Sequence, residues 1–154
     1  MAIRNVVKEG DEVLKKVSRP VEKFDEKLHT LLDDMAETMY SLDGAGLAAV
    51  QVGILRRVVV IDVGDGLIEL VNPKIIKQSG KQNETEGCLS CPGKWGITQR
   101  PMKVTVEAQN RFGEKIKVSG EQLKARALCH ELDHLDGHLF LEKCVRMLSP
   151  EEMN

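Results

Sequence analysis

Two histidines four residues apart, with a glutamate directly after the first, form the segment of this sequence most suggestive of chemistry: CHELDHLDG, residues 129–137. On a helix, side chains four positions apart project from the same face, so His130 and His134 can bind one metal ion. Glu131 then lies beside the ion, where a carboxylate can take a proton from a metal-bound water. The alternative is a surface helix that carries these residues by chance, because so short a pattern fixes few positions.

A catalytic metal site needs a third protein ligand and an open coordination position. The metzincin pattern HExxHxxGxxH would place its last histidine at position 140, which is Phe140. A thermolysin-type ligand from a separate later helix has little room, because only 20 residues follow His134. His138 lies beyond Gly137, which we expect to end the helix, so we expect His138 to be solvated.

The remaining candidates are the thiols of Cys88 and Cys91, in the segment CLSC. Thiolate binds both Zn(II) and Fe(II), and a turn can bring it to a helix that carries two histidines. If Cys88 alone binds, the site is an open Cys-His-His site and is catalytic. If both bind, the site is a closed Cys2His2 site and is structural. The CxxC spacing favours the closed site, whereas Glu131 would have no task in it.

Three motifs resemble those of the peptide deformylase family and occur in the same order: GxGLAAxQ at residues 44–51, EGCLS at residues 86–90 and HExDH at residues 130–134. This resemblance spans most of the chain. It implies a metal-dependent hydrolase that removes the N-formyl group from the N-terminal formylmethionine of newly synthesised polypeptides and releases formate. The ligands it implies are Cys88, His130 and His134, which bind Fe(II) natively and Zn(II), Ni(II) or Co(II) in purified protein.

The resemblance also implies how the reaction proceeds. Metal-bound hydroxide attacks the formyl carbon, with Glu131 as the general base and then the general acid. The Gln51 side-chain amide and the Leu89 backbone N–H donate to the carbonyl oxygen, and one such donor is worth about 3 kcal/mol in other acyl-transfer enzymes. We expect Gly46 to contact the substrate. We expect Cys129, where the family often has Gln, to line the methionine pocket.

Other residues near the motifs have structural interpretations. A solvated loop carboxylate is the ordinary expectation for Glu86, and a buried pairing with a basic group such as Arg100 is the alternative. Asp133 is expected to point away from the metal. Cys91, where the family often has Val or Ile, is expected to be a small buried apolar residue.

Hydrophobic periodicity predicts the helices that position these residues. Apolar residues at spacings of three and four predict a helix from Asp25 to about Leu42. A shorter helix is predicted from Asp11 to Val17, before the Arg19-Pro20 pair. The histidines lie on a third predicted helix at residues 121–137. The expected core-facing residues of the first helix are Leu28, Leu31, Leu32, Met35, Met39 and Leu42. In the last helix, Leu123, Ala127, Leu128, Glu131 and Leu135 are expected near one side.

Short runs rich in Val and Ile predict strands at residues 56–64, 67–73, 74–80, 102–109 and 114–120. Residues 83–96, NETEGCLSCPGKWG, are too rich in Gly and Pro to predict a regular element, and residues 43–53 predict a turn or a close backbone approach. Helices beside mostly antiparallel strands predict an α+β fold. We expect antiparallel sheets packed around a central helix that carries HExDH, together with N-terminal helices.

Length and composition predict one domain, so we interpret residues 1–154 as a single catalytic domain. The 22 basic and 24 acidic residues are interleaved and give a net charge of −2, which provides no reason to expect binding to nucleic acid or to a membrane. No segment has the pattern of a signal peptide or a membrane span, so a cytoplasmic location is expected.

The four cysteines, in a reducing compartment, are expected to form no disulfide. The expected partners are nascent formylated polypeptides, and the protein is expected to be a monomer. The resemblance also allows a transient association with the ribosome, although the tail MLSPEEMN is shorter than in members of the family that dock there through a C-terminal helix.

Overall fold

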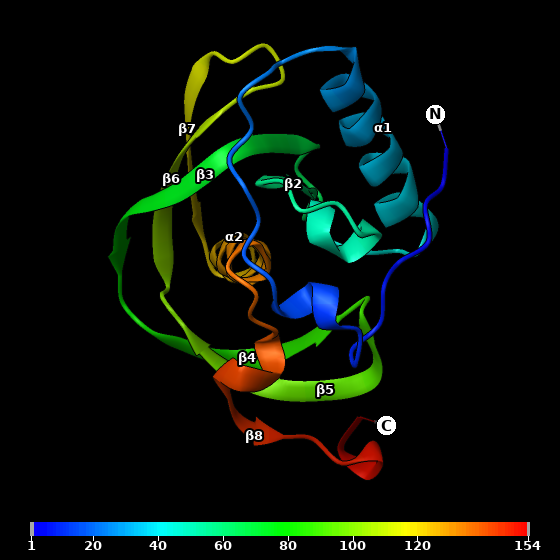
Figure 1. Cartoon of the computed structure of the whole chain (residues 1–154). Helices are drawn as coiled ribbons and strands as arrows, with labels where there is room; N and C mark the ends of the chain where they lie inside the picture. Colours follow the sequence, from blue (N-terminus) through cyan, green and yellow to red (C-terminus); the bar gives the residue numbers. More distant parts are fainter. Residues whose placement is uncertain (1, 154) are drawn as a thin grey trace.

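The computed structural model describes residues 2–153, and within them two antiparallel sheets lie on either side of a central helix (Figure 1). The large sheet has the strand order β1-β2-β3-β6-β7 and the small sheet the order β4-β5-β8. The helix between them, α2, carries the HExDH motif. The predicted α+β class is confirmed.

The bounds of the helices and strands are α1 (Glu26–Ser41), α2 (Leu123–Leu135), β1 (Gly46–Ala48), β2 (Val58–Ile61), β3 (Ile68–Ser79), β4 (Gln82–Cys88), β5 (Cys91–Arg100), β6 (Lys103–Gln109), β7 (Lys115–Glu121) and β8 (Cys144–Met147), with 3-10 turns η1 (Glu12–Lys15), η2 (Ala49–Val52), η3 (Phe140–Lys143) and η4 (Pro150–Met153).

Helix α1 forms where its periodicity predicts it. The Asp25 side chain accepts a hydrogen bond from the Leu28 backbone N–H at 3.2 Å and so caps the helix. The apolar stripe is buried as predicted up to Met39. Leu42 was wrongly placed in the core, because the helix ends at Ser41 and leaves Leu42 47% exposed.

Strand β2 connects the two helices through its alternating side chains. Val58 and Val60 pack in one core cluster with α1, while Val59 and Ile61 pack in a second cluster with α2. Successive side chains of a strand point to opposite faces, so this short strand is covered on both sides. The large sheet therefore fixes α2 relative to α1 through a fully apolar strand.

The two strands predicted at residues 67–73 and 74–80 are one strand, β3. Pairing with β6 continues across the expected break with a register shift between Val71 and Lys74, at Asn72 and Pro73. Asn72 has a positive φ of 52°, and its side chain exchanges hydrogen bonds with the Val21 backbone. The Asn-Pro pair therefore produces a bulge within the strand. In the sequence alone, the same pair predicts the end of a strand.

The prediction of no regular element at residues 83–96 is wrong. Strands β4 and β5 form a hairpin there, joined at Leu89 and Ser90, with Cys88 opposite Cys91. Pairing of β5 with β8, far away in the sequence, supports this hairpin. Residues 43–53 also contain more structure than a turn, namely β1 and η2.

Helix α2 begins later than predicted, at Leu123, and the side chain of Leu123 is 46% exposed. The helix ends as predicted, because Gly137 adopts a φ of 82° and its N–H donates to the His134 carbonyl. The 3-10 turn η1, capped by Asp11, lies against this end. No helix within residues 2–153 is long and apolar enough to cross a membrane.

Gly137 is the tightest point of this end of α2, because an added Cβ would lie 2.4 Å from the Lys15 carbonyl oxygen. We expect Gly137→Ala to lower the free energy of unfolding by about 2–5 kcal/mol, since a left-handed conformation and a backbone clash are both unfavourable. Gly53→Ala is the matched control, because Gly53 has a φ of 81° but open space around it. It should cost only about 1–2 kcal/mol. Urea unfolding measures both, and equal losses would contradict the close packing at Gly137.

Candidate metal centre

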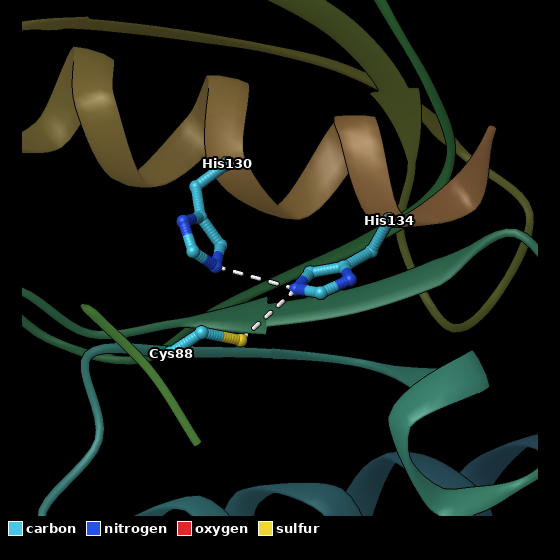
Figure 2. A group of neighbouring side chains, drawn as sticks. All are labelled: Cys88, His130 and His134. Carbon is cyan, nitrogen blue, oxygen red and sulfur yellow. Dashed lines mark hydrogen bonds between the residues drawn. The ribbon is translucent and has the colours of Figure 1, made fainter. Parts of the chain in front are cut away.

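Three side chains from two distant parts of the chain point toward one another (Figure 2). His130 and His134 lie one turn apart on α2, and Cys88 is the last residue of β4. The Nε2 atom of His134 lies 3.2 Å from His130 Nε2 and 3.4 Å from Cys88 Sγ. All three candidate ligand atoms lie within 4.8 Å of one another. The sequence-predicted ligand set is therefore assembled in space.

The separations of 3.2 and 3.4 Å from His134 fit a bound metal ion. Ligand bonds of about 2.0–2.3 Å at tetrahedral angles separate neighbouring ligand atoms by roughly 3.3–3.6 Å. The hydrogen bond with Cys91 and burial both raise the pKa of Cys88, so a thiolate there would need compensating positive charge. A divalent cation would supply that charge. Cys91 is not a member of the group, although it is buried beside Cys88 across the hairpin.

The ring of His130 is oriented by Glu86. The Nδ1 atom of His130 lies 2.9 Å from Glu86 Oε1, which is the usual way in which a metal-binding histidine is held by a carboxylate. With its Nδ1 proton directed at Glu86, His130 presents the lone pair of Nε2 to the cluster. Burial lowers the pKa of His130, but the charges of Glu131 and Glu86 outweigh this effect and raise it. Burial lowers the pKa of His134 well below its usual value, so His134 is neutral and able to bind a metal.

Glu131 is buried beside this cluster. Its Oε2 atom lies 4.0 Å from His130 Nε2, and its Oε1 atom has no hydrogen-bond partner among residues 2–153. Burial raises the pKa of Glu131 to about 7. A carboxylate with this pKa can accept and return a proton near neutral pH. An added Cβ at Gly46 would lie 2.5 Å from Glu131 Oε2, so a glycine is needed there to leave room for the carboxylate.

Gln51 is held by hydrogen bonds at both ends of its amide. Its Oε1 accepts from the Ala48 backbone N–H at 2.9 Å, and its Nε2 donates to Ser90 Oγ at 3.1 Å and to Cys88 Sγ at 3.5 Å. The amide N–H groups of Gln51 are therefore fixed at the edge of the cluster. Gln51, which the resemblance implies as an oxyanion donor, thus lies beside the candidate ligand Cys88.

A buried ion pair lies behind His130. Arg100 donates to Glu86 through Nε at 2.9 Å and through a terminal nitrogen at 3.0 Å, and to Asp133 at 2.5 Å. Burial would raise the pKa of Glu86, but hydrogen bonds from His130 and Arg100 outweigh it and lower the pKa to about 2. Glu86 is therefore the buried partner of Arg100, the alternative interpretation of this residue, and not a solvated loop carboxylate. The buried hydroxyl of Thr98 also donates to Glu86, which the sequence analysis did not predict. The one pattern that could have indicated it is that Thr98 lies two residues before Arg100 on β5, so that both side chains point to the same face of the strand.

The cluster opens into a cleft of about 640 Å³. Gly46, Gln51, Leu89 and Glu131 line it, together with Cys88 and His130. Along one side lies β1, an edge strand of the large sheet, which among the described strands pairs only with β2. Such an edge can pair with an extended peptide.

Cys129, which we expected in a substrate pocket, is not among the residues that line this cleft. Its side chain is only 5% exposed, because it lies on the face of α2 that packs against the large sheet and not on the face that lines the cleft. Burial raises the pKa of Cys129 to about 11, so it behaves as a small apolar residue. All four cysteines lie in the described part of the chain as free thiols. His138 is exposed, as predicted.

Comparisons with known proteins converge on one family. A family model described as polypeptide deformylase matches residues 3–149. A peptide deformylase of Acetivibrio thermocellus is 60% identical over 153 residues, which cover 99% of this chain and 90% of that protein. The crystal structure of a peptide deformylase from Legionella pneumophila has a TM-score of 0.90 at 45% identity and covers 98% of this chain and 89% of that chain. The structure of peptide deformylase from Thermotoga maritima has a TM-score of 0.91 at 40% identity, covering 94% and 99%.

The contact of Glu86 with His130 and Arg100 can be tested by Glu86→Gln, which keeps the shape and removes the charge. We expect the free energy of unfolding to fall by about 3–5 kcal/mol, because Arg100 is left without its main buried partner. Metal affinity should fall roughly 10–100-fold, because His130 is no longer oriented. Urea unfolding and chelator competition measure the two effects.

Glu84→Gln on the same strand is the matched control for Glu86→Gln, since Glu84 is exposed. It should change neither unfolding nor metal affinity. A Glu86→Gln variant as stable as the Glu84→Gln variant would contradict the role given to the buried pair.

Proposed function

Since the chain belongs to the polypeptide deformylase family and is an enzyme of that family, we propose that it removes the N-formyl group from formylmethionine at the start of new polypeptides. The observation that carries the proposal is a buried carboxylate, Glu131, with one unpartnered oxygen beside a Cys-His-His cluster at the floor of a cleft. Base, candidate ligands and access for a peptide thus occur together in one place.

Cys88, His130 and His134 would hold the metal, which we propose to be Fe(II) natively, with Zn(II), Ni(II) or Co(II) as substitutes. Thiolate and imidazole ligands suit all of these ions. When bound, such an ion acts as a Lewis acid that lowers the pKa of a coordinated water toward neutrality. These three protein ligands would leave one coordination position open, as hydrolysis requires.

Glu131 is the proton carrier of the proposed reaction. Its carboxylate takes a proton from the attacking water, whose oxygen bonds to the formyl carbon. Glu131 then returns the proton to the leaving nitrogen, which yields formate and a free N-terminal amine. Its pKa of about 7, raised by burial, keeps both protonation states accessible near neutral pH.

Gln51 and Leu89 would stabilise the negative charge that forms on the formyl oxygen. The Gln51 amide is oriented by Ala48 and Ser90, so only the N–H that lies 3.5 Å from Cys88 Sγ would have to turn to the formyl oxygen. Leu89 lines the same cleft from the hairpin turn, where its backbone N–H follows directly after Cys88. Preorganised donors of this kind act on the transition state more than on the substrate.

The substrate would enter as an extended peptide. The free edge of β1 at Gly46 lies beside Glu131, so backbone pairing there would bring a peptide N-terminus to the base. Every residue of the proposed site lies between Gly46 and His134 of one chain. We therefore propose that residues 1–154 act as one catalytic domain and as a monomer, in the cytoplasm where formylated polypeptides are made.

The direct test is formate release from a formyl-Met tripeptide by protein purified without oxygen and loaded with Fe(II). We expect release by the unchanged protein, and a loss of at least about 100-fold in Glu131→Gln, because a proton carrier typically contributes that much or more. Bound metal should remain, since Glu131 is not a proposed ligand. Glu84→Gln serves again as the control and should be fully active. Formate release by Glu131→Gln at the normal rate would overturn the role of Glu131, and no release from any formyl-Met peptide would overturn the proposed function.

The open coordination position can be tested by Cys91→Ser. We expect this variant to bind one metal ion per chain and to stay folded, because Cys91 lies outside the cluster of candidate ligands. Cys88→Ser should bind the metal much more weakly. Metal analysis after dialysis, together with circular dichroism, measures this. Loss of metal and partial unfolding in Cys91→Ser would instead indicate a closed Cys2His2 site.

A further inference from the structure

Large apolar side chains are exposed at three points around the mouth of the catalytic cleft. Leu42 is 47% exposed, Trp95 is 41% exposed and Leu123 is 46% exposed, and all three line the cleft that contains Cys88 and Glu131. Single exposed apolar residues need no explanation, but several around one concave site indicate a surface that binds apolar groups. The proposed chemistry uses none of these three side chains.

Trp95 is brought to the cleft by an irregularity in the β4–β5 hairpin. Glu86 pairs with Gly96 and Cys88 pairs with Cys91, so residues 92–95 of β5 lie opposite Gly87 alone. Such a bulge bends its strand and redirects a side chain. Here it turns Trp95 back over β4.

The indole ring lies directly on the backbone of Gly87. An added Cβ at Gly87 would meet ring atoms of Trp95 at 2.3–3.0 Å. The φ of Gly87 is not positive, so its glycine is required by this close approach and not by its conformation. One side of the ring is therefore fixed by β4, and the remainder is exposed in the cleft.

The position of Gly87 shows which part of a substrate would meet this ring. Gly87 directly precedes Cys88, and each residue of an extended peptide advances about 3.3–3.6 Å. The methionine of the substrate is bonded to the formylated nitrogen and must lie deep in the cleft, beside the buried Glu131. The residue after it would lie at the cleft mouth, where Trp95 is.

The other side chains near Trp95 leave the indole as the free contact surface. Lys94 forms an ion pair with Glu9, and the ammonium group of Lys8 donates to the Val6 carbonyl. An apolar side chain can pack on the exposed indole and leave both of these contacts in place. The chemistry of this position therefore favours apolar groups.

We propose that Trp95 determines specificity at the residue after formylmethionine, by forming an apolar wall against which a leucine-like side chain packs. This proposal rests on the proposed deformylase function. It concerns only the second residue, so selection of methionine itself is left to the deeper part of the cleft.

The first test compares kcat/KM for formyl-Met-Leu-Ser and formyl-Met-Ser-Ser. The unchanged enzyme should prefer the leucine peptide, and Trp95→Ala should reduce that preference roughly tenfold, near the lower limit for an apolar contact because the site is half open. Trp95→Phe should retain most of it. Phe112→Ala is the matched control, since Phe112 is an exposed aromatic residue that does not line the cleft.

The second test uses fluorescence, because Trp95 is the only tryptophan of the chain. In Glu131→Gln loaded with Zn(II), which has no redox chemistry, formyl-Met-Leu-Ser should shift the emission to shorter wavelength as it covers the ring. Formyl-Met-Ser-Ser should shift it less at saturation. Binding detected by calorimetry without any emission change would overturn the proposal.

The outcomes separate the two levels of inference. Formate release with the same leucine-to-serine preference in Trp95→Ala and the unchanged enzyme would overturn the role of Trp95 alone. An equal loss with both peptides would also overturn it, because Trp95 would then not discriminate at the second residue. Absence of formate with every formyl-Met peptide would overturn the proposed function, and this inference with it.

Discussion

The rest of the site depends on the buried pairing of Glu86 with Arg100. Removing both charges from water is unfavourable, and the pair is tolerated only because nearly every polar atom of it has a partner. Arg100 donates hydrogen bonds to Glu86 and Asp133, and Glu86 also accepts a hydrogen bond from His130. These contacts join β4, β5 and α2. They thereby fix the distance between the hairpin that ends in Cys88 and the helix that carries the histidines.

The same buried region holds two carboxylates in opposite electrostatic states. Hydrogen bonds from His130 and Arg100 lower the pKa of Glu86 to about 2, whereas burial without a partner at Oε1 raises the pKa of Glu131 to about 7. The difference between the two pKa values arises from the hydrogen-bond partners and not from the degree of burial, since Glu86 and Glu131 are both nearly inaccessible to solvent. Near neutral pH the Glu86 carboxylate is thus charged and orients the His130 ring, whereas the Glu131 carboxylate can exchange a proton. Such a separation of pKa values is typical of catalytic sites.

The parts of the structure that follow local rules could be predicted from the sequence, and the parts that depend on distant pairing could not. The periodicity of α1 and the spacing of His130 and His134 depend on neighbours in the chain, and both are found as expected. Residues 83–96 were read as irregular because Gly and Pro disfavour strands locally. Their hairpin is stabilised by pairing with β8 and by the Glu86 contacts, which no local pattern reveals. Cys129 was misplaced for a similar reason, because the face of α2 that meets the cleft depends on where the hairpin lies.

Glycines at the site are required by space more than by conformation, and each one fixes a different functional group. An added Cβ would reach Glu131 Oε2 at 2.5 Å from Gly46 and the Trp95 ring at 2.3 Å from Gly87. Neither glycine has a positive φ. At Gly46 the absent side chain lets the edge strand β1 lie against the Glu131 carboxylate, so under the proposed function a peptide paired with β1 would reach this carboxylate without any movement of the helix. Under the proposed function, the short distance between β1 and α2 is therefore a condition for catalysis as well as for packing.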